Sequence, residues 1–170
     1  MKILVAIFIF FITAIYLIVP SPDFPPPPPD SVRSSEPADT ESPLRRAYFT
    51  NMSREEVINF YRKSFDGNTR FFSIRLNYPP EEAQTIIRDQ TRSTYLEEIV
   101  HPLRETIYIN GFEPKEKKDE IWYEGKHFRQ KVIVRYVPSS SITRLSIWFC
   151  TFVIGYFIFK ELTNFCNLKK

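Results

Sequence analysis

Two long apolar runs bound a charged middle stretch of this chain. The first run, residues 3–19, has only Thr13 and Tyr16 as polar breaks, and the second, residues 142–159, has Arg144 as its one charged residue. As helices at ~1.5 Å per residue these runs span roughly 25 and 27 Å, close to the thickness of a bilayer's hydrocarbon core. We therefore predict transmembrane helices at residues 1–19 and 139–160.

Charge at the two ends predicts their orientation. Lys2 precedes the first run, and two lysines end the tail at residues 161–170. Because positive flanks stay on the cytoplasmic side of a cell membrane, both termini are expected in the cytoplasm and the middle stretch on the extracytoplasmic side. The alternative is a signal peptide cleaved from residues 1–21. The prolines that follow Val19 make a poor cleavage site, so an uncleaved anchor is favoured.

Residues 20–43 have the composition of a linker. Five prolines stand in a row from Pro25 to Pro29, and most of the other residues are serine or acidic. Such a segment cannot bury a core of its own and tends to be extended, partly as polyproline helix. We predict a disordered, proline-rich spacer here.

Residues 44–138 carry the periodic patterns of a folded domain. Ser53 and Glu56 stand at the spacing of a capping box, and apolar residues follow at helical spacing as far as Phe65. Residues 72–77 then alternate between apolar and polar side chains, which predicts a half-buried strand. The domain is therefore expected to begin with a helix followed by a strand.

A second helix is predicted to open at residues 79–82, where two prolines precede two glutamates. His101 and Pro102 are expected to kink or interrupt it. Asn110 and Gly111 fit either its left-handed cap or a tight hairpin turn, and the sequence leaves both open. The apolar positions assigned to this helix are Ala83, Ile86, Ile87, Tyr95, Leu96, Ile99, Leu103 and Ile107.

The last part of the domain predicts a β-hairpin. It would join residues 121–123, through a turn at residues 124–126, to a strand from Phe128 to Val137. Helix, strand, helix and then strands is the order of an α+β domain. The expected fold is a small antiparallel sheet covered by two helices, flanked by an N-terminal and a C-terminal transmembrane helix.

Alternation along the last strand separates an apolar face from a basic one. Phe128, Val132, Val134 and Tyr136 share one face with Gln130 and are expected to point into the core. A basic stripe on the other face, continued at the membrane entrance, is placed to meet anionic lipid head groups at ~1 kcal/mol per charge. A solvated or helix-covered sheet face is the alternative. The cations of this stripe are Arg129, Lys131, Arg135 and Arg144.

Two phrases of the domain resemble a known group of proteins. Residues 53–61 and residues 101–105 are similar to segments of uncharacterised bacterial membrane-anchored proteins. The resemblance covers about the central half of the chain. It implies a bacterial envelope context and attaches no activity to any residue.

Composition excludes several kinds of chemistry. Lys and Arg outnumber Asp and Glu by only 23 to 20, an excess too small to indicate a nucleic-acid partner. Cys150 and Cys166 lie in or beyond the second apolar run, and neither His101 nor His127 has a second ligand at metal-binding spacing. The sequence has no nucleotide-binding loop and no nucleophile motif. We therefore expect no catalytic residue, no metal and no cofactor.

A polar run at residues 88–94 interrupts the apolar spacing of the second helix. A local loop or an exposed edge is the plainer interpretation. The sharper one is a binding surface for an acidic partner or a glycan, formed by Arg88, Gln90 and Arg92. Glu97 and Glu98, farther along the same helix, are expected on its solvated face.

These patterns favour a non-enzymatic membrane-anchored component of the cell envelope. Its extracytoplasmic domain would bind a protein partner or cell-wall material at the membrane surface; the partners expected are the bilayer and another envelope protein. The alternative is an enzyme that acts on envelope lipid or polymer, with His101, Arg104 and Glu105 as the residues to consider.

Overall fold

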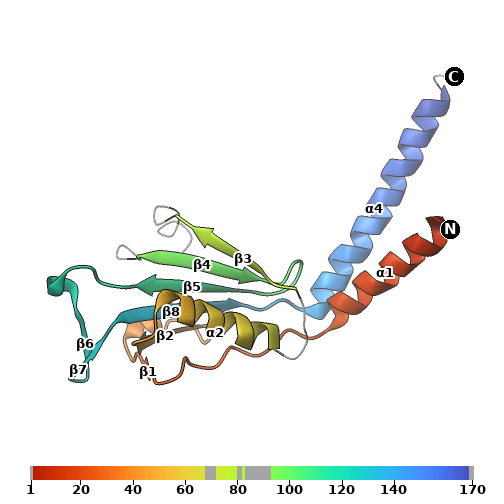
Figure 1. The fold of residues 1–170 in the computed structure, drawn as a ribbon. Helices are drawn as coiled ribbons and strands as arrows, with labels where there is room; N and C mark the ends of the chain where they lie inside the picture. The colour runs from red at the N-terminus through yellow and green to blue at the C-terminus, as the bar shows by residue number, and fades with distance from the viewer. Residues whose placement is uncertain (1, 68–71, 80–81, 83–92, 169–170) are drawn as a thin grey trace. The chain divides into compact units, whose positions relative to one another are not determined.

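The structure, a computed structural model, describes residues 2–67, 72–79, 82 and 93–168 (Figure 1). The chain divides into two compact units. One combines the two ends, Met1–Ser21 and Ser139–Lys170, and the other is the continuous stretch Pro22–Pro138. We call them the apolar unit and the sheet unit.

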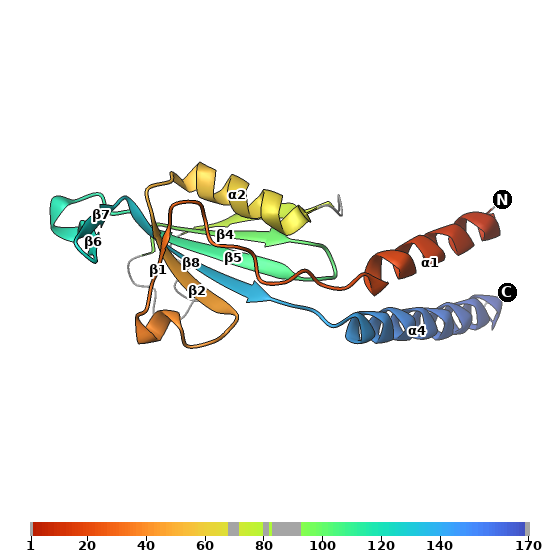
Figure 2. The ribbon, with the colours of Figure 1, turned by 90° about the horizontal axis from the view of Figure 1, so that it is seen from below.

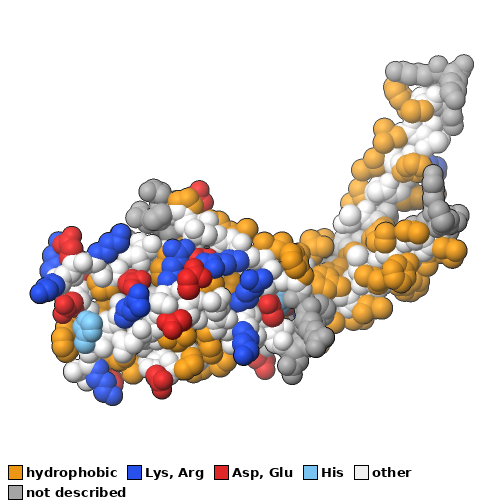
Figure 3. All heavy atoms as spheres, viewed as in Figure 1, with side chains coloured by type: hydrophobic (Ala, Val, Ile, Leu, Met, Phe, Trp, Pro, Cys, Tyr) orange, Lys and Arg blue, Asp and Glu red, His pale blue; other side chains and the backbone are white. Residues whose placement is uncertain are grey.

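The apolar unit contains helices α1 (Lys2–Ile18) and α4 (Ser141–Leu168), and Figure 3 shows hydrophobic side chains along both. Within the described residues one helix is long and apolar enough to cross a membrane, over the 26 residues Ser141–Cys166. Helix α1, with 17 residues, falls short of that length. The expected pair of flanking spans is therefore supported only at the C-terminal end.

The two helices of the apolar unit pack side by side and antiparallel. The Phe10 ring lies 4.2 Å from the Trp148 ring and 5.2 Å from that of Phe152, measured between centroids. The indole nitrogen of Trp148 donates to the Thr13 hydroxyl at 3.2 Å. The guanidinium of Arg144 donates to the Val19 carbonyl at 2.8 Å, which shows how a charge is accommodated near the start of this largely apolar helix.

The sheet unit is built on six antiparallel strands in the spatial order β1-β2-β8-β5-β4-β3. Strand β8 lies between β2 and β5 and pairs with both along most of its length. The strand bounds are β1 (Val32–Arg33), β2 (Arg45–Thr50), β3 (Ile74–Tyr78), β4 (Tyr95–Val100), β5 (Thr106–Phe112) and β8 (Gln130–Val137).

Helix α2 (Arg54–Asp66) covers one face of this sheet, as Figures 1 and 2 show from two directions. The predicted capping box starts it: the Glu56 carboxylate accepts from the Ser53 amide at 2.7 Å, and the Ser53 hydroxyl accepts from the Glu56 amide. The apolar side of the helix is buried against the sheet through Val57, Ile58, Tyr61 and Phe65. The first predicted helix of the domain is confirmed.

The alternation predicted for the last strand is confirmed from Gln130 to Tyr136, but the prediction is wrong for Phe128, which lies outside β8 near Phe49 rather than in the core beneath α2. Val132, Val134 and Tyr136 are buried in the core beneath α2. Gln130 is buried on the same face, where its amide nitrogen donates to the Met52 carbonyl and its oxygen accepts from the Tyr95 hydroxyl. Both polar ends of this side chain are therefore satisfied, which is how a glutamine is tolerated there.

The second predicted helix is wrong over its C-terminal half, where the chain forms the antiparallel strands β4 and β5. The turn between them begins at His101 and places Leu103 at φ 61°, a left-handed conformation that no helix contains. The domain consequently has a large sheet and one covering helix among its described residues, rather than a small sheet and two helices. Residues 83–92, the N-terminal part of that prediction, lie outside the described residues.

Asn110 and Gly111 form neither a helix cap nor a turn, because both lie inside β5. Gly111 is needed there for another reason. Tyr95 lies opposite Gly111 on the neighbouring strand β4, and a Cβ atom at position 111 would lie 2.0 Å from its ring. The glycine thus makes room for a core tyrosine.

The proline-rich segment lies within the sheet unit, and it differs from a free spacer. Phe24 packs on the core, with the Arg46 guanidinium 4.1 Å from its ring centroid and the Tyr136 ring at 6.2 Å. Pro25 and Pro28 are buried, and further along come β1 and a short 3₁₀ helix, η1 (Pro37–Asp39). Proline rings supply apolar surface without adding backbone N–H groups that need partners.

The predicted hairpin turn is present, but it joins β6 (Ile121–Tyr123) to the short strand β7 (Lys126–Phe128) in a separate two-stranded ribbon. The strand predicted at residues 128–137 is divided at Arg129, and its part from Gln130 onward is β8, which pairs with β2 and β5 instead. The turn of the ribbon uses Glu124 at φ 50° and Gly125 at φ 74°, the two positive values that a tight hairpin turn requires. A second 3₁₀ helix, η3 (Lys117–Asp119), precedes it.

Two core tyrosines give a matched test of this fold. The Tyr61 hydroxyl is buried without a hydrogen-bond partner in the described part of the chain, and burial raises its pKa. Replacing Tyr61 with Phe should therefore leave the free energy of unfolding unchanged or raise it by up to ~1 kcal/mol, whereas Tyr95→Phe should lower it by ~1–2 kcal/mol because the Gln130 oxygen loses its donor. Thermal unfolding followed by circular dichroism measures both. Equal losses in the two variants would contradict the core described here.

Candidate functional site

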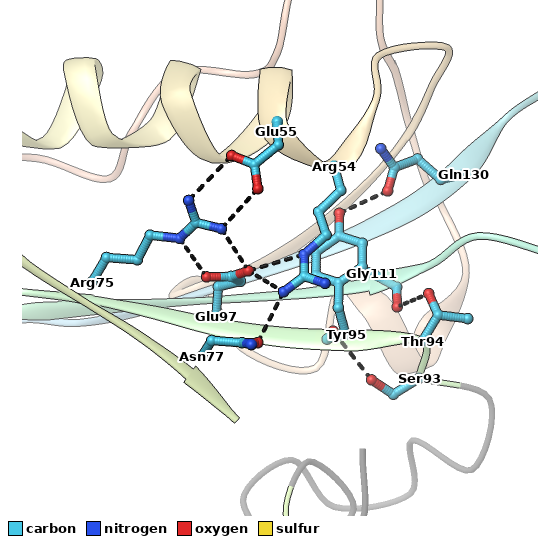
Figure 4. Close-up of polar contacts among 10 residues, drawn as sticks. All are labelled: Arg54, Glu55, Arg75, Asn77, Ser93, Thr94, Tyr95, Glu97, Gly111 and Gln130. Carbon is cyan, nitrogen blue, oxygen red and sulfur yellow. Dashed lines mark hydrogen bonds and ion pairs between the residues drawn. The ribbon is translucent and has the colours of Figure 1, made fainter. Parts of the chain in front are cut away.

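A buried carboxylate is the centre of an extended polar cluster in the sheet unit (Figure 4). Glu97 on β4 is fully buried, and its oxygens accept from Arg54 at the start of α2 and from Arg75 on β3. Arg75 also reaches Glu55 at 3.0 Å, and Arg54 reaches Asn77 at 2.8 Å. The cluster thus joins one helix and two strands.

The charges of this cluster balance internally. Burial acts to raise the pKa of Glu97, but the hydrogen bonds and charges of Arg75 and Arg54 outweigh it and hold that pKa below its usual value. The pKa of Glu55 is lowered by its hydrogen bonds to Arg75. Two carboxylates face two guanidinium groups, so the group has no unmatched charge to offer a ligand. Its role is to fix α2 to β3 and β4.

Glu97 and Glu98 are therefore not a solvated pair on a helix, as expected from the sequence. They alternate on a strand and point to opposite faces of the sheet. Glu98 accepts from the Tyr78 hydroxyl and from Thr106 Oγ1, the latter at 2.9 Å. The bond to Glu98 raises the pKa of Tyr78 to about 12.

The three residues considered for an enzyme do lie together, in the turn between β4 and β5. The His101 Nδ1 is 2.9 Å from the Glu105 carboxylate, which also pairs with Arg104 at 2.9 Å. The other ring nitrogen faces Asp66 at 3.3 Å, and the ring stacks on Phe65 at 4.2 Å. All three side chains are almost fully buried, so the contacts fasten the turn to the end of α2 rather than present a reactive group.

A concave site lies on the second face of the sheet, the one opposite α2. Its floor contains Phe49, Asn110 and Ile133, from three adjacent strands. Residues 36–39 form one wall, and residues 119–123 of the ribbon form the other. We call this site the hairpin groove; its cavity volume is about 420 Å³.

Charge inside the hairpin groove is held by an ion-pair cluster. The Lys131 ammonium is 2.7 Å from both Glu36 and Asp39, and the buried Asp39 also accepts from the Ser34 hydroxyl at 2.6 Å. Burial acts to lower the pKa of Lys131, but the two carboxylates outweigh it and raise that pKa. The cluster fixes η1 against β8.

The aromatic wall of the groove is also fixed. The Tyr123 ring stacks on Phe49, with centroids 4.3 Å apart and planes 22° from parallel, and its hydroxyl lies 2.9 Å from that of Ser35. Trp122, next to it on the ribbon, alternates to the opposite face, where its ring lies 5.3 Å from that of His127, and 64% of its surface is exposed. A large indole left in solvent is typical of a binding surface, here on the outer face of the ribbon.

The sequence-predicted binding residues fall in different places. Arg88, Gln90 and Arg92 lie outside the described residues. Arg129 pairs with Glu113 at 2.6 Å, Lys131 lies in the hairpin groove, Arg135 is exposed, and Arg144 belongs to α4. Two of the four cations of the basic stripe are thus paired with carboxylates. Their meeting with lipid head groups stays a prediction.

Sequence reasoning missed the hairpin groove because its parts are far apart along the chain. The one local signal was Trp122, a tryptophan in a three-residue strand rich in aromatic side chains. No group of three or more potential metal ligands occurs among the residues the structure describes.

Replacing Glu97 by Gln tests the buried cluster. The variant leaves two arginines without their shared carboxylate and should lose about 3 kcal/mol of unfolding free energy at neutral pH. Because the folded-state pKa of Glu97 is lowered, its contribution is complete above the unfolded pKa of ~4.3 and is lost as pH falls through the lower folded value. The difference between wild type and variant should therefore shrink below about pH 4.

The control is Glu116→Gln, which removes one partner of an exposed pair with Lys118 and should change stability little. Unfolding of the full chain by urea at several pH values provides both comparisons. A loss for Glu97→Gln no larger than that of the control, or one that does not depend on pH, would contradict the assignment.

Three comparisons with known proteins give no match. No protein-family model, no curated protein and no solved structure matches the chain. What the protein does must be inferred from its own residues.

Proposed function

We propose that this protein is a non-enzymatic, membrane-anchored component of the cell envelope. Its sheet unit is displayed on the extracytoplasmic side, and it binds a protein partner or cell-wall material at the membrane surface. Both termini lie in the cytoplasm. The anchor consists of α4 together with α1.

The observation that carries the proposal is helix α4. Its 26-residue span Ser141–Cys166 has almost no cover from the rest of the protein, and it includes Ile147, Phe149 and Phe157 among many exposed hydrophobic side chains. A helix apolar on all sides is stable in lipid and unfavourable in water. Helix α1 packs along it, which supports α1 as the second half of the anchor in spite of its length.

The sheet unit supplies the binding part of the proposal. It carries the charged side chains that Figure 3 shows, a groove, and an exposed tryptophan on the outer face of the ribbon. The enzyme alternative has less support, because His101 and Glu105 are buried and engaged with one another. A substrate could reach them only after the turn opened.

Cysteine labelling tests the topology. In a chain with Cys150→Ser and Cys166→Ser, which removes both native thiols, single cysteines are placed by Lys118→Cys in the sheet unit and Lys170→Cys at the C-terminus. A membrane-impermeant maleimide should label the first variant in intact cells, and the second only after the membrane is permeabilised. The cysteine-free chain is the control for background labelling.

Equal labelling of the two variants in intact cells would refute the proposed topology. Recovery of the protein in the soluble fraction after lysis would refute the anchor itself.

A further inference from the structure

We propose that one end of the sheet unit inserts exposed apolar side chains into the head-group region of the membrane. The inference rests on the proposed function, and it names the phospholipid surface as what this end of the displayed domain binds. Three observations carry it: the clustering of exposed apolar side chains, the place where the chain leaves the sheet unit, and a leucine held in a strained backbone conformation.

Exposed apolar side chains gather at one end of the sheet unit. Seven large hydrophobic side chains are exposed among the residues that the structure describes in this unit, and five of them belong to the end of the sheet at which β8 finishes. We call these five the apolar rim: Leu44, Phe72, Ile74, Leu103 and Val137. Trp122, by contrast, lies on the ribbon, which joins the opposite end of β8.

Strand register brings the apolar rim together (Figure 1). The last cross-strand row of the sheet, on the face opposite α2, consists of Ile74, Val100, Thr106 and Val137. Phe72 comes two residues before this row, and Leu103 lies in the turn that connects β4 to β5. The Leu44 carbonyl accepts from the Tyr136 amide, next to Val137, at 2.8 Å. Residues from five segments therefore share one end of the sheet.

Both connections to the apolar unit leave the sheet unit at this end. Only three residues separate Val137, the end of β8, from Ser141, the first residue of α4. At ~3.5 Å per residue, the Cα atoms of these two residues are at most about 14 Å apart. The N-terminal connection starts at the same place, because the Tyr136 hydroxyl donates to the Pro22 carbonyl at 2.5 Å.

This short connection favours lipid as the occupant of the apolar rim. Exposed apolar patches mark contacts with proteins or with membranes. With α4 in the bilayer, the chain holds the apolar rim within reach of the head groups in every molecule, so lipid is always present at high local concentration. A protein partner would have to displace that lipid.

Leu103 is presented to its surroundings by a fixed turn. Its side chain is 80% exposed, and its φ of 61° lies in the left-handed region, which glycine or asparagine adopts at lower cost. His101 fastens the turn through its contacts with Glu105 at 2.9 Å and with the ring of Phe65. A leucine here neither fills the core nor suits the backbone, so folding does not account for it. Contact with lipid does.

Charge near the apolar rim is mixed. Arg135 on β8 and Lys63 in the last turn of α2 are exposed, and so is Asp23 beside Pro22. Long basic side chains can keep their charge at the phosphate level while neighbouring apolar groups lie deeper. Since the charges nearly balance, insertion is driven by the apolar rim and is expected in zwitterionic phosphatidylcholine without anionic lipid.

Single tryptophans test the inference in the full chain, reconstituted into phosphatidylcholine vesicles. One variant combines Trp122→Phe, Trp148→Phe and Leu103→Trp, and a second has Phe72→Trp in place of Leu103→Trp. Apolar groups of interfacial segments lie ~5–10 Å into the boundary between head groups and acyl chains, so bromine near the start of the acyl chains should remove about half of each indole's fluorescence. Acrylamide in the water should quench these indoles weakly.

Two further variants are the controls. Trp148→Phe alone leaves Trp122, an exposed residue at the other end of the sheet, which should be quenched by acrylamide and not by brominated lipid. Trp122→Phe alone leaves Trp148 in α4, which brominated lipid should quench if the helix is in the membrane. Because Leu103 and Phe72 are both exposed, their variants should keep the thermal unfolding of the wild type, and either one suffices for the test.

Two results would overturn the inference while Trp148 is quenched by brominated lipid. Indoles at positions 72 and 103 that acrylamide quenches as strongly as Trp122 would show that this end stays in water. Indoles shielded from both quenchers would show that protein covers them. Absence of lipid quenching at Trp148 would refute the anchor of the proposed function, and this inference with it, so the two failures are distinguishable.

Discussion

The alternation of side chains along strand β8 links the core of the sheet unit to its hairpin groove. Val132, Val134 and Tyr136 point toward α2 and fill the core, while Lys131 and Ile133 point the other way and line the groove. The strand is hydrogen-bonded on both sides, by β2 and by β5, so its register fixes both faces together. A shift of one residue would exchange the apolar and charged sets and destroy the core and the groove at once.

Buried ion pairs then attach the remaining elements to this sheet. Glu97 joins the start of α2 to β3, and Lys131 joins η1 to β8. Such pairs contribute modestly to stability because each charge must leave water, but an unpaired member would be costly. Each pair is satisfied only when its partners are correctly placed, so it holds the neighbouring elements in one arrangement. The wall of the groove that contains η1 depends on this geometry.

Several elements could be predicted because their signals are local. The capping box at Ser53, the turn at Gly125 and the alternation from Val132 to Tyr136 each depend on residues close in sequence. Strand β4 could not be predicted in this way. Its residues Tyr95, Leu96 and Ile99 are buried on the two faces of the sheet, and their spacing along the chain is the same as that of an apolar helix.

The candidate site was harder to predict than the strands, because its residues come together only in the folded chain. Glu97 resembled a solvated glutamate, since its two arginines are 43 and 22 residues away. The walls of the groove come from segments about eighty residues apart, and β2, which carries Phe49 in its floor, was not predicted at all. Pairing between distant strands is set by tertiary packing, which leaves no periodic trace in either segment.

Amide hydrogen exchange of the full chain in detergent, followed by mass spectrometry, tests the central position of β8 most directly. Peptides from β8 should exchange among the slowest in the sheet unit, because their amides are bonded between two strands under α2. Peptides from the β6–β7 ribbon, which pairs only with itself, should exchange much faster. Exchange in β8 as fast as in the ribbon would contradict the account.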